Sequence, residues 1–407
     1  MAEPSHRRGD RRLARALALA LGLLLAGCGG GHRVAMVPQQ GQAAPQPVQP
    51  MPPVSAAPLP SAAANPKIPG ATATIGLLLP LSGSNAALGK ALSQAGQMAL
   101  FENGDDTTAL VPRDSEGSGG PTGGAEDAMS EGASILLGPV FAAHAKQVGP
   151  VASAAHVPVV SFTTDRTVAG PGVYVMGILP ELQVERVVQY AASQGYKRFA
   201  ALLPGTAYGQ IVAQSLNRAA TSAGGSVAAI EYYDPGAVEF SGVVQKLAGE
   251  GPFDALLIPE GGVRLHAIAP LLAFYNIDTS KVKVLGSALW TDPKLAGEPT
   301  LAGAWFAAPS NELWASFAQR YRTTYGAEPP RLASLAYDAV SMAAVLAKTQ
   351  ALNDAGITRP EGFTGIDGPF RFGTDGVVQR NLDILEVQPT GFAVKDPAPK
   401  TFPAPQG

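Results

Sequence analysis

Charged side chains and cysteine are both scarce in this chain of 407 residues. Asp, Glu, Lys and Arg together make up 15% of it, and the formal net charge is −3. An average soluble protein has roughly 25% charged residues. A chain without a basic excess has no electrostatic footprint for nucleic acid, so we expect no such partner. Cys28 is the single cysteine, so no disulfide can form within the chain, and packing must hold the fold.

Residue patterns of common active sites are missing as well. The five histidines show no spacing typical of metal ligands. The chain has no Gly-x-Ser-x-Gly elbow, its lone cysteine lies near the N-terminus, and its carboxylates form no recognisable catalytic pair. We therefore expect a protein that is not an enzyme, with no metal and no other cofactor.

The N-terminus is basic and then apolar, which predicts export. Five arginines precede the run Ala16–Ala26, which is too short for a membrane span of roughly 20 residues but is typical of a secretory signal. The run ends in Leu25-Ala-Gly-Cys28, which matches a lipobox. We predict that residues 1–27 are a lipoprotein signal peptide and that Cys28 carries a lipid; a free or buried thiol is the alternative. Gly29 after the cysteine favours the periplasmic face of the outer membrane.

Residues 28–70 are rich in Pro, Gln and Ala, as in Pro-Gln-Pro-Val-Gln-Pro-Met-Pro-Pro at 45–53. A segment with almost no charge and no apolar period cannot bury a core, so we predict a disordered, partly polyproline II tether. At about 3.1 Å per residue it would reach on the order of 130 Å when extended.

From residue 71 the chain alternates short apolar runs with amphipathic segments. Helical periodicity appears at 181–191, 207–222 and 238–249. Between these segments lie candidate strands at 74–79, 135–137, 157–162, 198–203, 227–233, 253–259, 282–286 and 305–308. This alternation predicts an α/β fold with two doubly wound parallel sheets. The segment 370–380, continuing to 382–387, is the one part that reads as an antiparallel hairpin.

The stretch Leu77-Leu-Leu-Pro-Leu-Ser-Gly-Ser84 has the layout of a phosphate-binding loop but lacks its residues. Five residues separate Gly83 from Gly89, and Ala91 stands where a hydroxyl would hold Mg²⁺. What remains is a loop at the carboxyl end of a strand, where ligands of open α/β sheets bind. Ser82 and Gly83 are therefore candidate cleft residues, with a simple turn and helix cap as the alternative. Trp290 follows another strand end and is the tryptophan that we expect to be most exposed.

Several motifs resemble the type 1 periplasmic binding proteins, and within them the penicillin-binding protein activator lipoproteins (the LppC/LpoA family). The likeness extends over about residues 71–397. The motifs are Leu77–Gly83, Leu137-Gly-Pro-Val-Phe141, Ser161-Phe-Thr-Thr-Asp-Arg166, Val168–Tyr174, Ala207-Tyr-Gly209, Leu285–Trp290, Ala333–Asp338 and Gly365–Arg371.

The resemblance implies two lobes that exchange segments. Its domains would be lobe 1 at 71–180, lobe 2 at 181–308, a return to lobe 1 at 309–360, a return to lobe 2 at 361–397 and a tail at 398–407. It implies an interlobe cleft with these candidate residues: Ser82, Gly83, Phe141, Ser161, Thr163, Asp165, Tyr208, Glu260 and Trp290.

Relatives that bind branched-chain amino acids hold the substrate carboxylate with Ser and Thr hydroxyls and its ammonium with Tyr and Glu. The aligned positions here are Ala142, Asp165, Val263 and Ala288. Leaving a buried zwitterion without partners costs several kcal/mol, on the order of its whole useful affinity. The sequence therefore argues against an amino-acid receptor.

The resemblance implies a non-enzymatic lipoprotein that binds a bifunctional penicillin-binding protein and activates this peptidoglycan synthase. The helical repeat domain of enterobacterial members is replaced here by the 28–70 tether. The alternative is the substrate-binding receptor of an ABC importer for an amide, an aromatic acid or another small solute. It would hold that ligand near Ser82, Phe141, Thr163, Tyr208 and Trp290.

Overall fold

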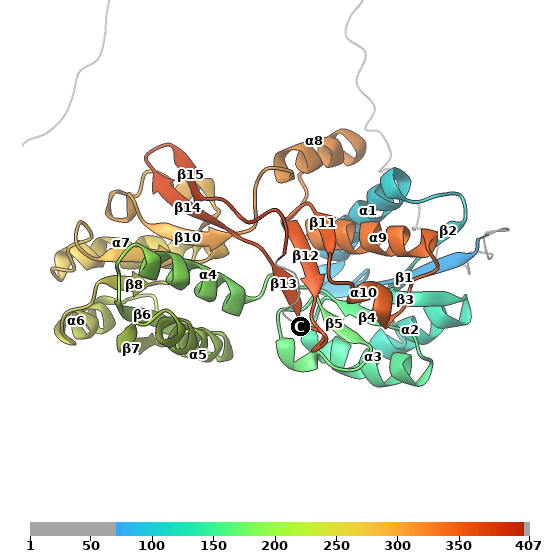
Figure 1. Ribbon diagram of the computed structural model, residues 1–407, viewed down its shortest axis with the longest axis horizontal. Helices are drawn as coiled ribbons and strands as arrows, with labels where there is room; N and C mark the ends of the chain where they lie inside the picture. Colours follow the sequence, from blue (N-terminus) through green and yellow to red (C-terminus); the bar gives the residue numbers. More distant parts are fainter. Residues whose placement is uncertain (1–70, 403–407) are drawn as a thin grey trace, which may run out of the picture. The chain divides into compact units, whose positions relative to one another are not determined.

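The computed structural model describes residues 71–402, and the predictions for the signal peptide, Cys28 and the tether lie outside them. Five parallel strands form the first sheet, in the order β2-β1-β3-β4-β5. We call this part the first lobe (Figure 1). Its elements are β1 Ala73–Leu79, α1 Ala86–Asn103, β2 Thr108–Asp114, α2 Gly120–Ser130, β3 Ala133–Leu137, α3 Ala142–Ala154, β4 Val159–Ser161 and β5 Val173–Val175.

A second sheet has seven strands in the order β15-β14-β10-β9-β8-β6-β7, and we call this part the second lobe. Strands β14 and β15 are antiparallel to their neighbours, and the other strands run parallel. Its elements are α4 Pro180–Ser193, β6 Arg198–Pro204, α5 Ala207–Ser222, β7 Ser226–Tyr233, α6 Ser241–Gly249, β8 Ala255–Leu257, α7 Gly262–Phe274, β9 Lys283–Gly286, β10 Trp305–Ala308, β14 Asp383–Gln388 and β15 Gly391–Asp396.

The chain between β10 and β14 belongs to the first lobe. Its elements are α8 Trp314–Tyr325, α9 Ala333–Lys348, α10 Asp354–Ile357, β11 Phe363–Gly365, β12 Gly368–Phe372 and β13 Val378–Arg380. Helix α9 packs along α1, and the Asn103 amide donates to Ser341 Oγ across that contact at 3.1 Å. Among residues 71–402 there are also five short 3-10 turns: Gly83–Asn85, Arg166–Val168, Ala288–Trp290, Pro293–Leu295 and Pro299–Leu301.

The return segment corrects one predicted boundary. We predicted that 361–397 as a whole rejoins the second lobe. Strands β11, β12 and β13 instead form a small antiparallel sheet of their own, and Phe370 and Phe372 from it are buried in the core of the first lobe. The chain enters the second sheet only at β14. The hairpin at 370–380 is confirmed, but it is not the only antiparallel pairing, because β14 also pairs that way with β10 and β15.

Burial explains why these strands form. Leu77, Leu78 and Leu79 are fully buried, since helices cover both faces of the first sheet. The second sheet likewise has one apolar cluster on each face. Strand β2 was missed in the sequence because it contains Pro112 and two charged residues. It is an edge strand, where a residue without an N–H is tolerated. Within residues 71–402 no helix is long and apolar enough to cross a membrane.

Candidate functional site

The predicted site residues follow the carboxyl ends of parallel strands. In each sheet those ends lie along one edge. Along the chain, the strands are added first to one side of the sheet and then to the other, so the direction of addition reverses between one pair of neighbouring strands. The pair is β1 and β3 in the first lobe and β6 and β8 in the second. Open α/β sheets bind ligands at such switch points. Ser82 and Phe141 flank the first switch point, and Tyr208 and Glu260 flank the second.

In the first lobe the loop after β1 is ordered by an acid at the end of β2. Asp114 Oδ1 accepts hydrogen bonds from the backbone N–H groups of Leu81 and Glu116, both at 2.9 Å. Burial opposes ionisation of Asp114, but hydrogen bonds from Ser82, Glu116 and Leu81 together lower its pKa. Gly83 has φ +68°, and a side chain there would meet the Glu116 carboxyl group. The Ser82–Gly83 turn is therefore stabilised by hydrogen bonds within the first lobe.

The loop after β4 also uses its polar groups internally. Ser161 is fully buried, and its hydroxyl donates to the Pro139 carbonyl at 2.8 Å. Thr163 is buried, and its Oγ1 accepts from the Asp165 N–H at 3.1 Å. The Thr167 hydroxyl donates to Asp165 Oδ1 at 2.6 Å. This bond, with help from Lys146, lowers the pKa of Asp165.

Two aromatic predictions have different outcomes. Phe141 is half-buried at the start of α3 and packs edge-on against His144, with ring centroids 5.4 Å apart. The expectation that Trp290 is exposed is wrong, because its side chain is fully buried. Its Nε1 donates to the Ile258 carbonyl at 3.2 Å, and the indole lies on Gly286, where a Cβ would come within 2.3 Å of it. The indole of Trp290 can pack in the core because Gly286 has no side chain that would occupy the same space.

The polar groups of the second lobe gather around Glu260. The Tyr233 hydroxyl donates to Glu260 Oε2, the Gly261 N–H donates to Oε1 at 3.1 Å, and Arg264 Nη1 lies 3.7 Å from Oε2. The Tyr208 hydroxyl donates to the Pro259 carbonyl at 3.2 Å, and burial raises the pKa of Tyr208 to about 12. Burial and Glu260 also raise the pKa of Tyr233.

Tyr233 and Arg264 were missed in the sequence, although signals for both exist. Tyr233 ends β7 at the same sheet edge, and Arg264 follows Glu260 by four residues. Within residues 71–402, no hydrogen bond or ion pair joins the predicted residues of one lobe to those of the other. The structure therefore brings the predicted residues together in two groups, one per lobe.

Apolar side chains are exposed next to the second group. Val263, in the first turn of α7, is 85% exposed, and Leu289 is 51% exposed. The two follow neighbouring strands, and a Cβ placed on Gly261 would lie 3.1 Å from that of Leu289. The backbone N–H of Ala288 donates to Gln183 Oε1 at 2.8 Å. In the part of the chain that the structure describes, no group of His, Cys, Asp and Glu could hold a metal ion.

Comparisons with known proteins agree with this geometry. An ABC transporter substrate-binding protein from Sphaerobacter thermophilus superimposes with a TM-score of 0.66 at 16% identity, covering 82% of this chain and 98% of that one. A solute-binding protein of an ABC transporter from Rhodopseudomonas palustris BisB5, in complex with 3,4-dihydroxybenzoic acid, gives a TM-score of 0.59 at 19% identity, covering 82% and 97%. These likenesses confirm the predicted α/β fold with parallel sheets.

A curated relative matches only part of the chain. It is an uncharacterised protein of Rickettsia prowazekii (strain Madrid E), 19% identical over 219 residues, and the match covers 52% of this chain and 59% of that protein. The periplasmic binding protein family model, in contrast, matches residues 72–392, which span both lobes and the return segment. The chain belongs to the periplasmic binding protein family.

Proposed function

We propose that this protein is a non-enzymatic lipoprotein of the periplasm that docks on a bifunctional peptidoglycan synthase and stabilises its active conformation. The observation that carries the proposal is the replacement of amino-acid-binding groups at the strand ends. Val263 and Ala288 offer no hydroxyl or carboxylate, Ala142 offers no hydroxyl, and the carboxylate of Asp165 is engaged with Thr167 and Lys146. A zwitterion would be left there without partners.

Exposed aliphatic groups support a protein partner at this edge. Val263 and Leu289 project from the carboxyl-end edge of the second sheet, where both are more than half exposed. Exposed apolar side chains that lie close together are typical of protein interfaces, whose centres are apolar and poor in charge. An activator must bind the active state of its partner more tightly, by about 1.4 kcal/mol for each tenfold shift in the population. In this proposal lipid on Cys28 anchors the protein, and residues 28–70 give it reach.

Pull-down and titration against purified bifunctional synthases test the proposal. Val263→Glu places a charge on the proposed surface and should weaken binding by about tenfold or more. Phe274→Glu is the matched control. Phe274 is also apolar and 73% exposed, but it lies at the opposite end of the same helix, about 16 Å away. Absence of binding at micromolar protein, or equal losses in the two variants, would count against the proposal.

A second candidate is a receptor for a small solute other than an amino acid. The polar group of Tyr208, Tyr233 and Glu260 at the switch point of the second sheet favours it. The similar protein from Rhodopseudomonas palustris was solved with an aromatic acid bound. A thermal-shift screen against amides and aromatic acids separates the candidates. A rise of several degrees with one compound, lost in Tyr208→Phe, would favour the receptor.

A further inference from the structure

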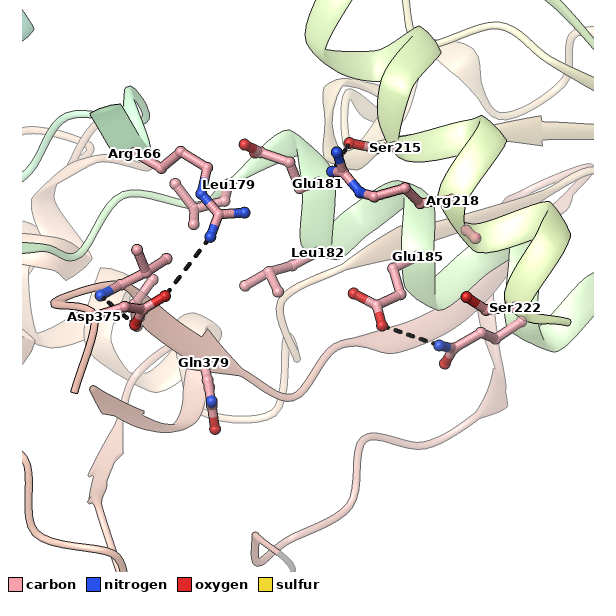
Figure 2. Close-up of a pocket in the computed structure, with 14 residues that line it drawn as sticks. Arg166, Leu179, Glu181, Leu182, Glu185, Ser215, Arg218, Ser222, Asp375 and Gln379 are labelled. Atoms are coloured by element: carbon pink, nitrogen blue, oxygen red, sulfur yellow. Dashed lines mark hydrogen bonds and ion pairs between the residues drawn. The ribbon is translucent and has the colours of Figure 1, made fainter. Parts of the chain in front are cut away.

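A cavity of about 350 Å³ lies apart from the strand-end groups, between α4, α5 and the hairpin of β12 and β13 (Figure 2). Its volume is within the range of small-ligand sites, which begins near about 300 Å³. Glu181 and Glu185 line it from α4, and Ser215 and Arg218 line it from α5. Gln183 is not among its lining residues and bonds to Ala288 at the strand-end edge instead. The cavity and the candidate cleft thus use different residues of α4.

One carboxyl group that lines the cavity has a buried oxygen without a partner. Glu181 lies in the first turn of α4 and is only 7% exposed, and its Oε2 atom is buried without any hydrogen bond. Buried polar atoms are nearly always paired, since an unpaired acceptor costs the full free energy of its desolvation. A carboxyl oxygen can only accept, so its missing partner is an N–H or O–H donor. The surrounding cavity leaves room for a ligand to bring one.

Charges around Glu181 favour a cationic donor. Arg166 and Asp375 lie 3.7 Å apart and balance each other at one wall. Of the remaining charged groups that line the cavity, two are the carboxyl groups of Glu181 and Glu185 and one is the guanidinium of Arg218. Arg218 is exposed, donates to Ser215 Oγ at 3.1 Å, and has no ion pair within residues 71–402. Because its charge is solvated, Arg218 does not need an anionic ligand.

Apolar groups complete the lining and can cover a short carbon chain. Leu179 and Leu182 line the cavity beside α4, and Val377 and Val378 line it from the hairpin. Figure 2 shows Leu182 between the hairpin residues Asp375 and Gln379 and the two glutamates of α4. A compound with an amine at one end and a few methylene groups behind it matches this division into a charged and an apolar side.

We propose that this cavity binds a small organic cation, an alkylammonium or guanidinium compound, whose N–H groups donate to the Glu181 carboxyl group. Glu185 adds a second negative charge one helical turn away. Arg218 adds a positive charge to the lining, which opposes the charge of the ligand. The site does not depend on the proposed docking function, because it shares none of the residues invoked there.

Calorimetric titration of the full-length protein in detergent with 1,4-diaminobutane, and separately with guanidinium chloride, tests the proposal. Potassium chloride at matched ionic strength is the blank. We expect saturable binding of at least one probe. Glu181→Gln keeps the shape of the side chain and should weaken binding at least about tenfold, as expected for a charged hydrogen bond. Arg218→Gln removes the opposing positive charge and should tighten binding or leave it unchanged.

Controls keep the outcome unambiguous. Glu126→Gln removes an exposed carboxylate on α2, away from the cavity, and should bind as the wild type does. If Glu181→Gln shifts the urea midpoint of the free protein, Glu181→Asp replaces it, since that variant keeps the charge but withdraws it by one methylene and should also bind more weakly. Absence of binding with both probes, undiminished binding in the variants at 181, or loss of binding in Arg218→Gln would overturn the assignment.

Discussion

Arg380→Met should destabilise the protein at pH 8 by up to about 3–5 kcal/mol, because it leaves a buried carboxyl group without its cation. The Arg380 side chain is 1% exposed and that of Asp338 is 0% exposed, with Nη1 and Oδ2 3.6 Å apart. A second buried carboxyl group, that of Asp367, lies nearby and is paired with Arg331 at 2.6 Å. This group of four charges joins α9 to β13 and to the turn between β11 and β12.

The magnitude follows from what remains after the substitution. Asp338 Oδ1 would keep its hydrogen bond from the Ile366 N–H, at 2.6 Å. Its Oδ2 has no hydrogen bond at all and depends on the charge of Arg380. Removing one member of a buried ion pair costs about 3–5 kcal/mol, against a total stability of roughly 5–15 kcal/mol for a domain. The variant should therefore fold, but with a large part of its stability lost.

The loss of stability caused by Arg380→Met should depend on pH. Burial raises the pKa of Asp338 to about 7, against the opposing effect of Arg380. The folded protein thus holds a proton that the unfolded chain releases near pH 4, so this group lowers stability as pH rises from about 4 to about 7. Without Arg380 the pKa of Asp338 rises further. Because Asp338 is protonated near pH 5, the loss caused by Arg380→Met should be smaller there than at pH 8.

Guanidinium denaturation at pH 5 and pH 8 measures both quantities. Lys90→Met removes an exposed cation from α1 and is the control. Adding Asp338→Asn to Arg380→Met should restore part of the stability at pH 8, because no unpaired charge remains. A loss below about 1 kcal/mol at pH 8, or a larger loss at pH 5, would refute the reasoning, since breaking a buried pair should cost several times that amount.

Three further substitutions have definite expected outcomes. Gly209→Ala should destabilise by about 1–3 kcal/mol, because the new Cβ would lie 1.9 Å from the Pro204 carbonyl oxygen; thermal melting measures this. Trp290→Ala should lose about 3–5 kcal/mol in urea denaturation, since it empties a fully buried site. Tyr233→Phe should lose about 1.5–3 kcal/mol in the same assay, because its buried hydroxyl donates to the carboxyl of Glu260.

The control for Gly209→Ala comes from the same lobe. Gly242 lies in α6, and a Cβ there would meet nothing within 4 Å, so Gly242→Ala should stabilise by about 0.4–1 kcal/mol. Similar changes at the two glycines would contradict the close approach of α5 to the end of β6. The folded fraction of Trp290→Ala should bind any solute with the affinity of the wild type. If the folded variant binds a ligand more weakly, the indole belongs to the binding site.

Local patterns in the sequence determined most of the α/β scaffold. The strand at 305–308 and the helix at 207–222 were predicted with the bounds that the structure has, because apolar periodicity is a local signal. The seven other predicted strands were found with shifted ends. Strands β2, β5, β11 and β15 were missed. Pro112 masks β2, β5 and β11 have only three residues each, and β15 is largely exposed. The site residues at strand ends were also within reach, because parallel strands share one carboxyl edge.

Only the tertiary structure decided which of those residues are free to act. The Trp290 indole is buried and donates to the carbonyl of Ile258, and Glu260 accepts from Tyr233; both partners are remote in sequence. The unpaired oxygen of Glu181 likewise depends on what α5 and the hairpin place around it. Strand and helix formation depends on neighbours along the chain, whereas burial and pairing depend on groups that are tens to hundreds of residues apart and meet only on folding.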